Sequence, residues 1–162
     1  MNRFIFIIPA IFLLFQSCES KKNGIIMTVN GPISPAEIGK TLTHEHVLVD
    51  FVGADSFSFS KYERSEVIAK ALPYLQEIKD LGCTTFMECT PEFLGRDPLL
   101  LKTLSDKSGL NIITNTGYYG VRNNKFVPSS LQKKSAEELS DIWFAEWQNG
   151  IDESGIKPGF IK

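Results

Sequence analysis

Short runs of apolar residues alternate along this chain with longer amphipathic stretches. The apolar runs are rich in β-branched residues and are bounded by Gly, Asn or Asp, which is typical of strands. The amphipathic stretches repeat their apolar positions every three or four residues, which is typical of helices. The pattern predicts strands at 40–49, 84–88, 111–115 and 159–162. It predicts helices at 61–81, 97–109 and 135–150.

Each predicted helix carries recognisable end signals. In the first, one stripe holds Val67, Ile68, Ala71, Leu72, Leu75, Ile78 and Leu81. Gly82 follows as the expected C-terminal cap, while Pro73 should kink this helix or start it anew. The second helix has Asp97 as N-cap and Pro98 at its first position, and the third opens on a capping box of Ser135 and Glu138.

Two further segments complete the pattern. Residues 24–33 read as a short β-hairpin, with Asn30 and Gly31 supplying the positive φ values of the turn. Residues 116–134 form a long loop, and long loops in compact domains are often functional.

Strands that alternate with helices imply a parallel α/β sheet. The repeat of about 30 residues suits a (β/α)8 TIM-barrel type of fold, of which the chain would hold the first four βα units after the N-terminal hairpin. A small doubly wound sheet is the alternative, although no Gly-rich phosphate loop follows any of the predicted strands.

Composition narrows the class of protein. The net charge of −2, from 17 basic and 19 acidic residues, favours no nucleic acid partner. A hydrophobic content of 43% in 162 residues suits one packed domain.

The N-terminus reads as an export signal. Arg3 gives a positive start, residues 4–15 are almost wholly apolar, and Cys18 follows the small residue Ser17. This resembles a lipoprotein signal peptide over 1–18 that is cleaved before Cys18, the lipidation site, with 19–23 as a linker and 24–162 as the domain. We therefore expect an exported bacterial lipoprotein anchored to the membrane on the periplasmic or outer-membrane side. Ordinary signal cleavage nearby, with Cys18 incidental, is the alternative.

Two further cysteines, Cys83 and Cys89, flank the second predicted strand. Along a strand their Cα atoms would lie roughly 20 Å apart, beyond the reach of a disulfide. We expect both to be buried, free residues.

His44 and His46 are the only histidines in the chain, and they stand two positions apart. Because residues i and i+2 of a strand point to the same face, both imidazoles would converge on one spot. Converging imidazoles are typical of a transition-metal site. Two half-buried histidines satisfied by hydrogen bonds would give the same spacing, so the pair alone leaves both interpretations open.

Four blocks of sequence together resemble the phosphotriesterase family of the amidohydrolase superfamily. They are Gly39–His46, Gly95–Asp97, Asn115–Tyr119 and Gly155–Lys162. The resemblance covers about residues 24–162, and its strength lies in the order and spacing of the blocks. It implies a (β/α)8 barrel whose site holds two divalent metals, usually Zn²⁺, at the carboxyl ends of the strands.

The same resemblance assigns roles to individual residues. His44 and His46 would bind the more buried metal, and Lys162, carboxylated by CO₂, would bridge both metals. Tyr119 would line the substrate pocket, or simply pack. Glu45 and Glu88 would be structural or support the ligands, while Arg96 and Asp97 would fix a loop and cap a helix. The implied reaction is hydrolysis of a phosphotriester, lactone or related ester by a metal-bridged hydroxide.

The family takes two more histidines and an aspartate from later strands, and no counterparts occur here. We therefore expect no catalytic residue within this chain, which would be an inactive fragment holding half of the site. One alternative is a non-catalytic surface lipoprotein, which either binds a small ligand or pairs with a partner half-barrel. The partner would be a second copy of the chain, giving a homodimer, or a missing C-terminal half. Another alternative is that His44 and His46 form only a structural metal site.

Overall fold

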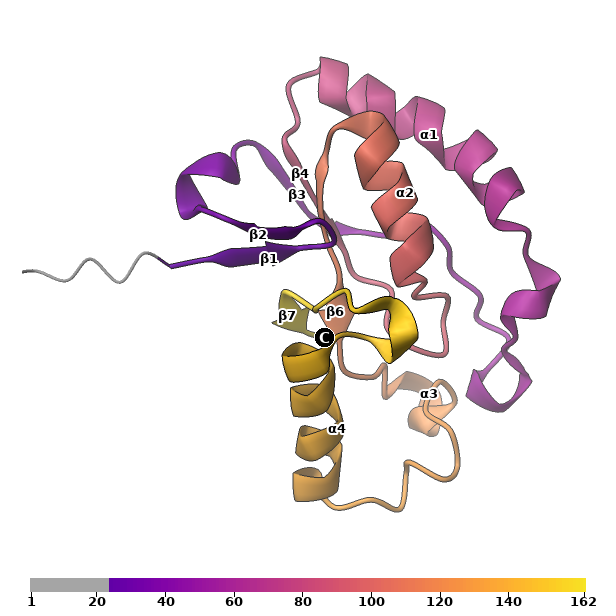
Figure 1. The fold of residues 1–162 in the computed structure, drawn as a ribbon. Coiled ribbons are helices and arrows are strands. Elements are labelled where there is room, and N and C mark those ends of the chain that lie inside the picture. The colour runs from indigo at the N-terminus through magenta and orange to yellow at the C-terminus, as the bar shows by residue number, and fades with distance from the viewer. Residues whose placement is uncertain (1–23) are drawn as a thin grey trace, which may run out of the picture.

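The computed structural model describes residues 24–162 and has the alternating strands and helices that the pattern predicts (Figure 1). The predicted signal peptide, the lipidation site Cys18 and the linker lie outside the described residues. In chain order the strands and helices are β1 (Ile26–Thr28), β2 (Gly31–Ile33), β3 (Thr41–Glu45), α1 (Arg64–Asp80), β4 (Thr85–Glu88), α2 (Pro98–Ser108), β5 (Asn111–Ile113), β6 (Asn115–Thr116), α3 (Val121–Asn124), α4 (Ala136–Asn149) and β7 (Phe160–Ile161).

The N-terminal hairpin is present, but its turn lies one residue earlier than predicted. Thr28 pairs with Gly31, so the two turn residues are Val29 and Asn30. Val29 is buried in the core and its N–H donates to the carbonyl of Ile112, which fixes the turn against the neighbouring strand. Gly31 keeps the positive φ of 108° that the sequence signal indicated.

Strand β3 is shorter than the predicted 40–49 because the chain leaves the sheet after Glu45. Beyond that point the N–H of Val47 donates to the side-chain carboxylate of Glu88, at the end of β4, instead of to a backbone carbonyl. His46 therefore lies just past the end of β3, at its carboxyl edge.

Helix α1 is one continuous element that contains Pro73, so of the two predicted effects of Pro73, the start of a new helix is wrong. Pro73 lies on the exposed side, where water can reach the carbonyl that its missing N–H leaves free. The helix ends as predicted: the N–H of Cys83 reaches the carbonyl of Ile78, with Gly82 at φ 86°. Leu81, expected in the apolar stripe, is 70% exposed because it stands at the helix end, beyond the last turn that packs on the sheet.

The other two predicted helices have the expected caps. The side chain of Asp97 accepts from the N–H of Leu100, with Pro98 at the first turn of α2. Ser135 and Glu138 form the capping box of α4. Part of the long loop forms α3, a four-residue turn with left-handed backbone at Arg122 and Asn123.

Beyond the antiparallel hairpin of β1 and β2, the described strands form two parallel sheets whose strand order follows the chain. Strands β3, β4 and β5 pair in that order, and β6 pairs with β7. Only Thr114 separates β5 from β6, and its carbonyl accepts from the N–H of Gly159 beside β7. In both parallel sheets, neighbouring strands follow each other in the chain, so residues 24–162 show no reversal of the kind found in a doubly wound sheet. This parallel α/β arrangement is compatible with part of a TIM barrel.

The core lies between the sheet and the two helices α1 and α2, which pack against each other (Figure 1). Its most deeply buried members include Leu100, Leu101 and Leu104 from α2 and Ile112 from β5. Cys83 and Cys89 are buried and free, as predicted.

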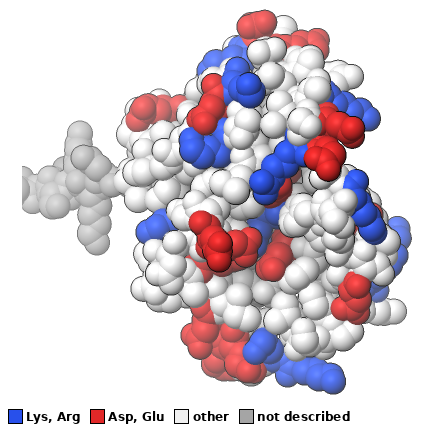
Figure 2. Space-filling model, turned by 45° about the vertical axis from the view of Figure 1, so that its right-hand side comes forward, with Lys and Arg blue, Asp and Glu red and all other residues white. Residues whose placement is uncertain are grey.

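Two surface properties of residues 24–162 bear on the predicted partners. None of the helices there has both the length and the apolar character that a membrane crossing requires. On the face turned to the viewer in Figure 2, acidic and basic side chains are interspersed among uncharged ones.

Candidate metal centre

Three of the predicted site residues meet at the carboxyl ends of the parallel strands. His44 is on β3, His46 follows it, and Lys162 follows β7. The two imidazole centroids lie 5.3 Å apart, with the rings inclined by 62°. The Nζ of Lys162 is 3.1 Å from Nε2 of His44, although the residues are 118 positions apart. The predicted convergence of both imidazoles on one face is therefore present, and the lysine joins it.

The position of Lys162 is set by backbone contacts with the neighbouring strand. Its N–H donates to the carbonyl of Thr116 at 2.7 Å, which continues the parallel ladder of β6 and β7. Gly117 makes this approach possible, because a Cβ there would lie only 2.6 Å from the carbonyl oxygen of Lys162. Gly117 also has φ 100°, a conformation that side-chain-bearing residues rarely adopt.

His46 is also held by Thr90, in the loop after β4, which is itself bonded to Glu88 at the end of β4. Its Nδ1 lies 2.9 Å from the hydroxyl of Thr90, and that hydroxyl in turn bonds to the carboxylate of Glu88. Glu88 and Thr90 are both fully buried. Glu88, expected as either structural or supporting, is therefore connected to a predicted ligand through one intermediate hydroxyl.

The carboxylate of Glu88 is surrounded by donors despite its burial. The N–H of Val47 donates to Oε1 at 3.2 Å, and the N–H of Thr90 donates to Oε2 at 3.1 Å. Burial raises the pKa of Glu88 to about 7, although these hydrogen bonds and the charge of Lys162 oppose that rise.

Partial burial lowers the pKa of His46, and electrostatic interactions with His44 and Lys162 lower it further. Glu45 acts in the opposite direction. The environment thus favours the neutral imidazole, which is the form that can bind a metal.

Asn115 of β6 ties the neighbouring strand end to this group. Its side-chain amide donates to the carbonyls of Glu88 and Thr90, both at 3.0 Å. Asn115 is fully buried, so these bonds are shielded from competition by water. These bonds link the end of β4 and the loop after it to β6.

Arg96 and Asp97 have the structural roles that the sequence indicated. The side chain of Asp97 caps α2 and accepts two N–H groups of Arg64. The guanidinium of Arg96 is 1% exposed and pairs with both carboxylate oxygens of Glu146 on α4. It also donates to the carbonyl of Asn115 at 2.9 Å. Arg96 thereby fixes the loop after β4 to both β6 and α4.

The remaining predicted site residues are Tyr119 and Glu45. Tyr119 is half-buried and stacks on Phe126, with ring centroids 5.8 Å apart, so its packing role is present. Its role in a substrate pocket stays a prediction. Glu45 borders a cavity between β3 and α1, together with Lys70 and Tyr74.

The donor set suits part of a transition-metal site. Two imidazoles converge, and a lysine that could be carboxylated stands beside them. Within residues 24–162, no three side chains from His, Cys, Asp and Glu gather closely enough to hold a metal ion. Among the described residues, the two imidazoles and Lys162 are thus the candidate ligands.

Sequence reasoning missed Thr90, Asn115 and Glu146. Thr90 stands two residues after Glu88 at the end of a predicted strand, and this position is the only local signal for it. Asn115 lies within a block that carries the family resemblance, without an individual role. Glu146 gives no signal, because its partner Arg96 is 50 positions away.

A parallel α/β sheet with histidine and lysine side chains at its carboxyl edge defines a class of candidate metal-dependent enzymes. The phosphotriesterase family profile matches residues 24–162, and the chain belongs to this family. The family is generally metal-dependent.

Individual relatives are similar over most of this chain. It is 30% identical over 172 aligned residues to an N-acetyltaurine hydrolase of Salmo salar, covering 88% of this chain and 48% of the relative. It is 29% identical over 140 residues to a phosphotriesterase homology protein of Mycobacterium tuberculosis (strain ATCC 25618 / H37Rv), covering 83% and 43%. A phosphotriesterase homology protein of Escherichia coli (strain K12) is 29% identical over 126 residues, covering 76% and 40%. The chain thus spans about half the length of the curated relatives it matches.

Proposed function

We propose that this chain supplies the first half of the binuclear zinc site of a phosphotriesterase-family hydrolase. The observation that supports this most strongly is the convergence of His44, His46 and Lys162 at the carboxyl edge of the sheet. Hydrolase relatives support the reaction class. The remaining ligands would come from later strands, for which the relatives have the necessary length.

Each of the three residues has a defined task in this proposal. The imidazoles donate nitrogen lone pairs to the metal. As an ammonium, Lys162 donates a proton toward Nε2 of His44 and so competes for the lone pair of that ligand. When its neutral amine adds to the carbon of CO₂ and releases a proton, it becomes an anionic carbamate with two oxygen acceptors. Carboxylation therefore frees His44 and adds a ligand in one step.

When bound, zinc supplies a Lewis acid that lowers the pKa of water and polarises the substrate oxygen that gains charge. Phosphotriesters, lactones and related esters present a suitable electrophilic centre. The name of the N-acetyltaurine hydrolases extends this range to an amide carbonyl. We propose a small ester, lactone or amide as substrate, with Tyr119 at the edge of its pocket.

Zinc binding by the purified full chain tests the proposal. Equilibrium dialysis against Zn²⁺ with bicarbonate should give an affinity that falls at least tenfold in His44→Asn and His46→Asn. A carbamate signal from ¹³C-bicarbonate should disappear in Lys162→Ala and persist in the matched control Lys157→Ala. Unchanged zinc affinity in both histidine variants would contradict the proposed site.

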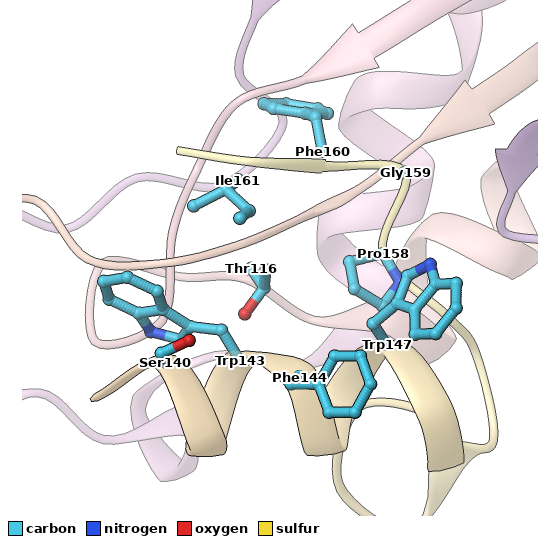
Figure 3. Close-up of a pocket in the computed structure, with 9 residues that line it drawn as sticks. All are labelled: Thr116, Ser140, Trp143, Phe144, Trp147, Pro158, Gly159, Phe160 and Ile161. Atoms are coloured by element: carbon cyan, nitrogen blue, oxygen red, sulfur yellow. The ribbon is translucent and has the colours of Figure 1, made fainter. Parts of the chain in front are cut away.

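A second candidate function is supported by the apolar surface between α4 and β7. Phe144 and Trp147 on α4 are 53% and 55% exposed, and Ile161 on β7 is 66% exposed. Figure 3 shows Ile161 pointing from β7 toward α4, while Phe160 points to the other side of the strand. The cavity there is about 280 Å³, and exposed apolar patches of this kind often mark contacts with a protein partner.

We propose that this face pairs with a second half-barrel, which in the purified chain would be a second copy. Analytical ultracentrifugation should then give a dimer that Trp147→Ser converts to monomer. Leu81→Ser, at a position that is 70% exposed at the end of α1, should leave it dimeric. A wild-type chain that stays monomeric at high micromolar concentration would exclude self-pairing.

A further inference from the structure

The hydroxyl of Thr90 stands between a predicted metal ligand and a buried carboxylate. It bonds to Nδ1 of His46 on one side and to Oε1 of Glu88 on the other. Thr90 and Glu88 are at most 1% exposed. Each hydrogen bond among these three buried groups needs one donor and one acceptor. This requirement determines which nitrogen of His46 carries a hydrogen.

The two side-chain oxygens of Glu88 each accept a backbone N–H. Val47 donates to Oε1 and Thr90 donates to Oε2. A carboxyl group that accepts at both oxygens is best satisfied as a carboxylate, which has no proton to donate. The hydrogen bond between Glu88 and the Thr90 hydroxyl must therefore use the hydroxyl proton.

A hydroxyl has only one proton, so the Thr90 oxygen can only accept from His46. Nδ1 of His46 must then carry the hydrogen. A neutral imidazole has one N–H, and its Nε2 is therefore left with a free lone pair. A nitrogen can bind a metal only through such a lone pair.

The arrangement is also fixed in space. Asn115 of β6 donates to the carbonyls of both Glu88 and Thr90, so the segment that carries the hydroxyl is tied to the next strand. His44 differs, because its Nε2 faces the ammonium of Lys162. The two histidines thus have different hydrogen-bond partners.

We propose that Thr90 and Glu88 form a positioning pair that holds His46 in the Nδ1–H tautomer and presents its Nε2 to zinc. The tautomer follows from hydrogen bonds on this chain alone, whereas the benefit for zinc rests on the proposed function. Neither residue touches the metal, so both act through His46.

The tautomer can be read directly by ¹⁵N NMR of the histidine rings in the metal-free full chain at pH 8. The chain has only two histidines, and His44→Asn assigns the signals of His46. Nδ1 of His46 should have the shift of a protonated nitrogen and Nε2 that of a bare one. Thr90→Val, which removes the hydroxyl but keeps the shape, should give averaged shifts, while Thr90→Ser should retain the wild-type spectrum.

Thr114→Val is the matched control for Thr90→Val. Thr114 is equally buried, between β5 and β6, and its hydroxyl has no hydrogen-bond partner among the described residues. Thr114→Val should leave both the spectrum and zinc affinity unchanged. Thr90→Val should weaken zinc binding about 10- to 100-fold, and Thr90→Ser should restore it.

The outcomes separate the two proposals. A wild-type His46 that is protonated at Nε2, or whose spectrum Thr90→Val does not alter, overturns the positioning pair. Unchanged zinc affinity in Thr90→Val, with the wild type binding zinc, overturns its benefit to the metal. A locked tautomer in a chain that binds no zinc supports the hydrogen-bond pair and overturns the proposed zinc site.

Discussion

Neutralising Glu146 should destabilise the whole described domain, because Glu146 compensates the buried guanidinium of Arg96. Its carboxylate accepts from both terminal nitrogens of Arg96, at 2.6 and 3.0 Å, and from the hydroxyl of Thr116 at 2.5 Å. Its side chain is 13% exposed, and that of Arg96 is 1% exposed. In Glu146→Gln the guanidinium keeps its burial but loses its main counter-charge.

The size of the effect follows from these contacts. Removing one partner of a buried ion pair typically costs about 3–5 kcal/mol. The glutamine oxygen still accepts one hydrogen bond, and Glu92 lies 3.5 Å from Arg96 as a second carboxylate. We therefore expect a loss of about 2–3 kcal/mol in the free energy of unfolding.

Urea unfolding followed by tryptophan fluorescence suits this test, because both tryptophans of the chain are on α4, as is Glu146. Asp141→Asn is the matched control: it makes the same charge change at an exposed position of α4 and should stay within about 0.5 kcal/mol of wild type. A Glu146→Gln variant as stable as this control would refute the reasoning. It would mean that water or Glu92 compensates Arg96 fully.

Three further predictions concern other parts of the chain. Burial raises the pKa of Glu92 to about 7, as it does that of Glu88, so the wild-type fold should lose stability as pH rises from about 4.5 to 7. Glu92→Gln should make this slope shallower, leaving the part due to Glu88, and should stabilise the fold at pH 8 by about 1 kcal/mol, allowing for partial exposure. Destabilisation at pH 8 would contradict this. Gly117→Ala should cost at least about 2 kcal/mol by urea unfolding, because it adds a clash with Lys162 to the cost of its positive φ, whereas Gly155→Ala, with open space, should cost about 1 kcal/mol. Cys18→Ala should release the chain from the membrane fraction and abolish incorporation of radiolabelled fatty acid, and continued labelling would exclude Cys18 as the lipidation site.

The sequence predicted the elements of this fold well because their signals are local. Asp97 with Pro98, and Ser135 with Glu138, mark helix starts within four residues, and both caps are present. The errors arose where the outcome depends on distant parts of the chain. The hairpin turn shifted because Val29 bonds to Ile112, and β3 ended early because Val47 bonds to Glu88.

In the candidate site, too, local features could be predicted from the sequence and long-range contacts could not. His44 and His46 are two residues apart, so the period of a strand is enough to predict that they converge. Lys162 reaches them only because β7 pairs with β6, and the family resemblance was needed to anticipate this.

The roles of Thr90 and Asn115 could not be predicted from a single sequence. A threonine and an asparagine at strand ends are common, and their roles arise only when β3, β4 and β6 lie side by side. Thr90 then bonds to a histidine 44 positions away, and Asn115 to carbonyls at least 25 positions away. Ligands are conspicuous in sequence because few residue types can bind a metal. The residues that orient the ligands act through ordinary hydrogen bonds, which many residue types can make. They can therefore be recognised only from their positions in the folded structure.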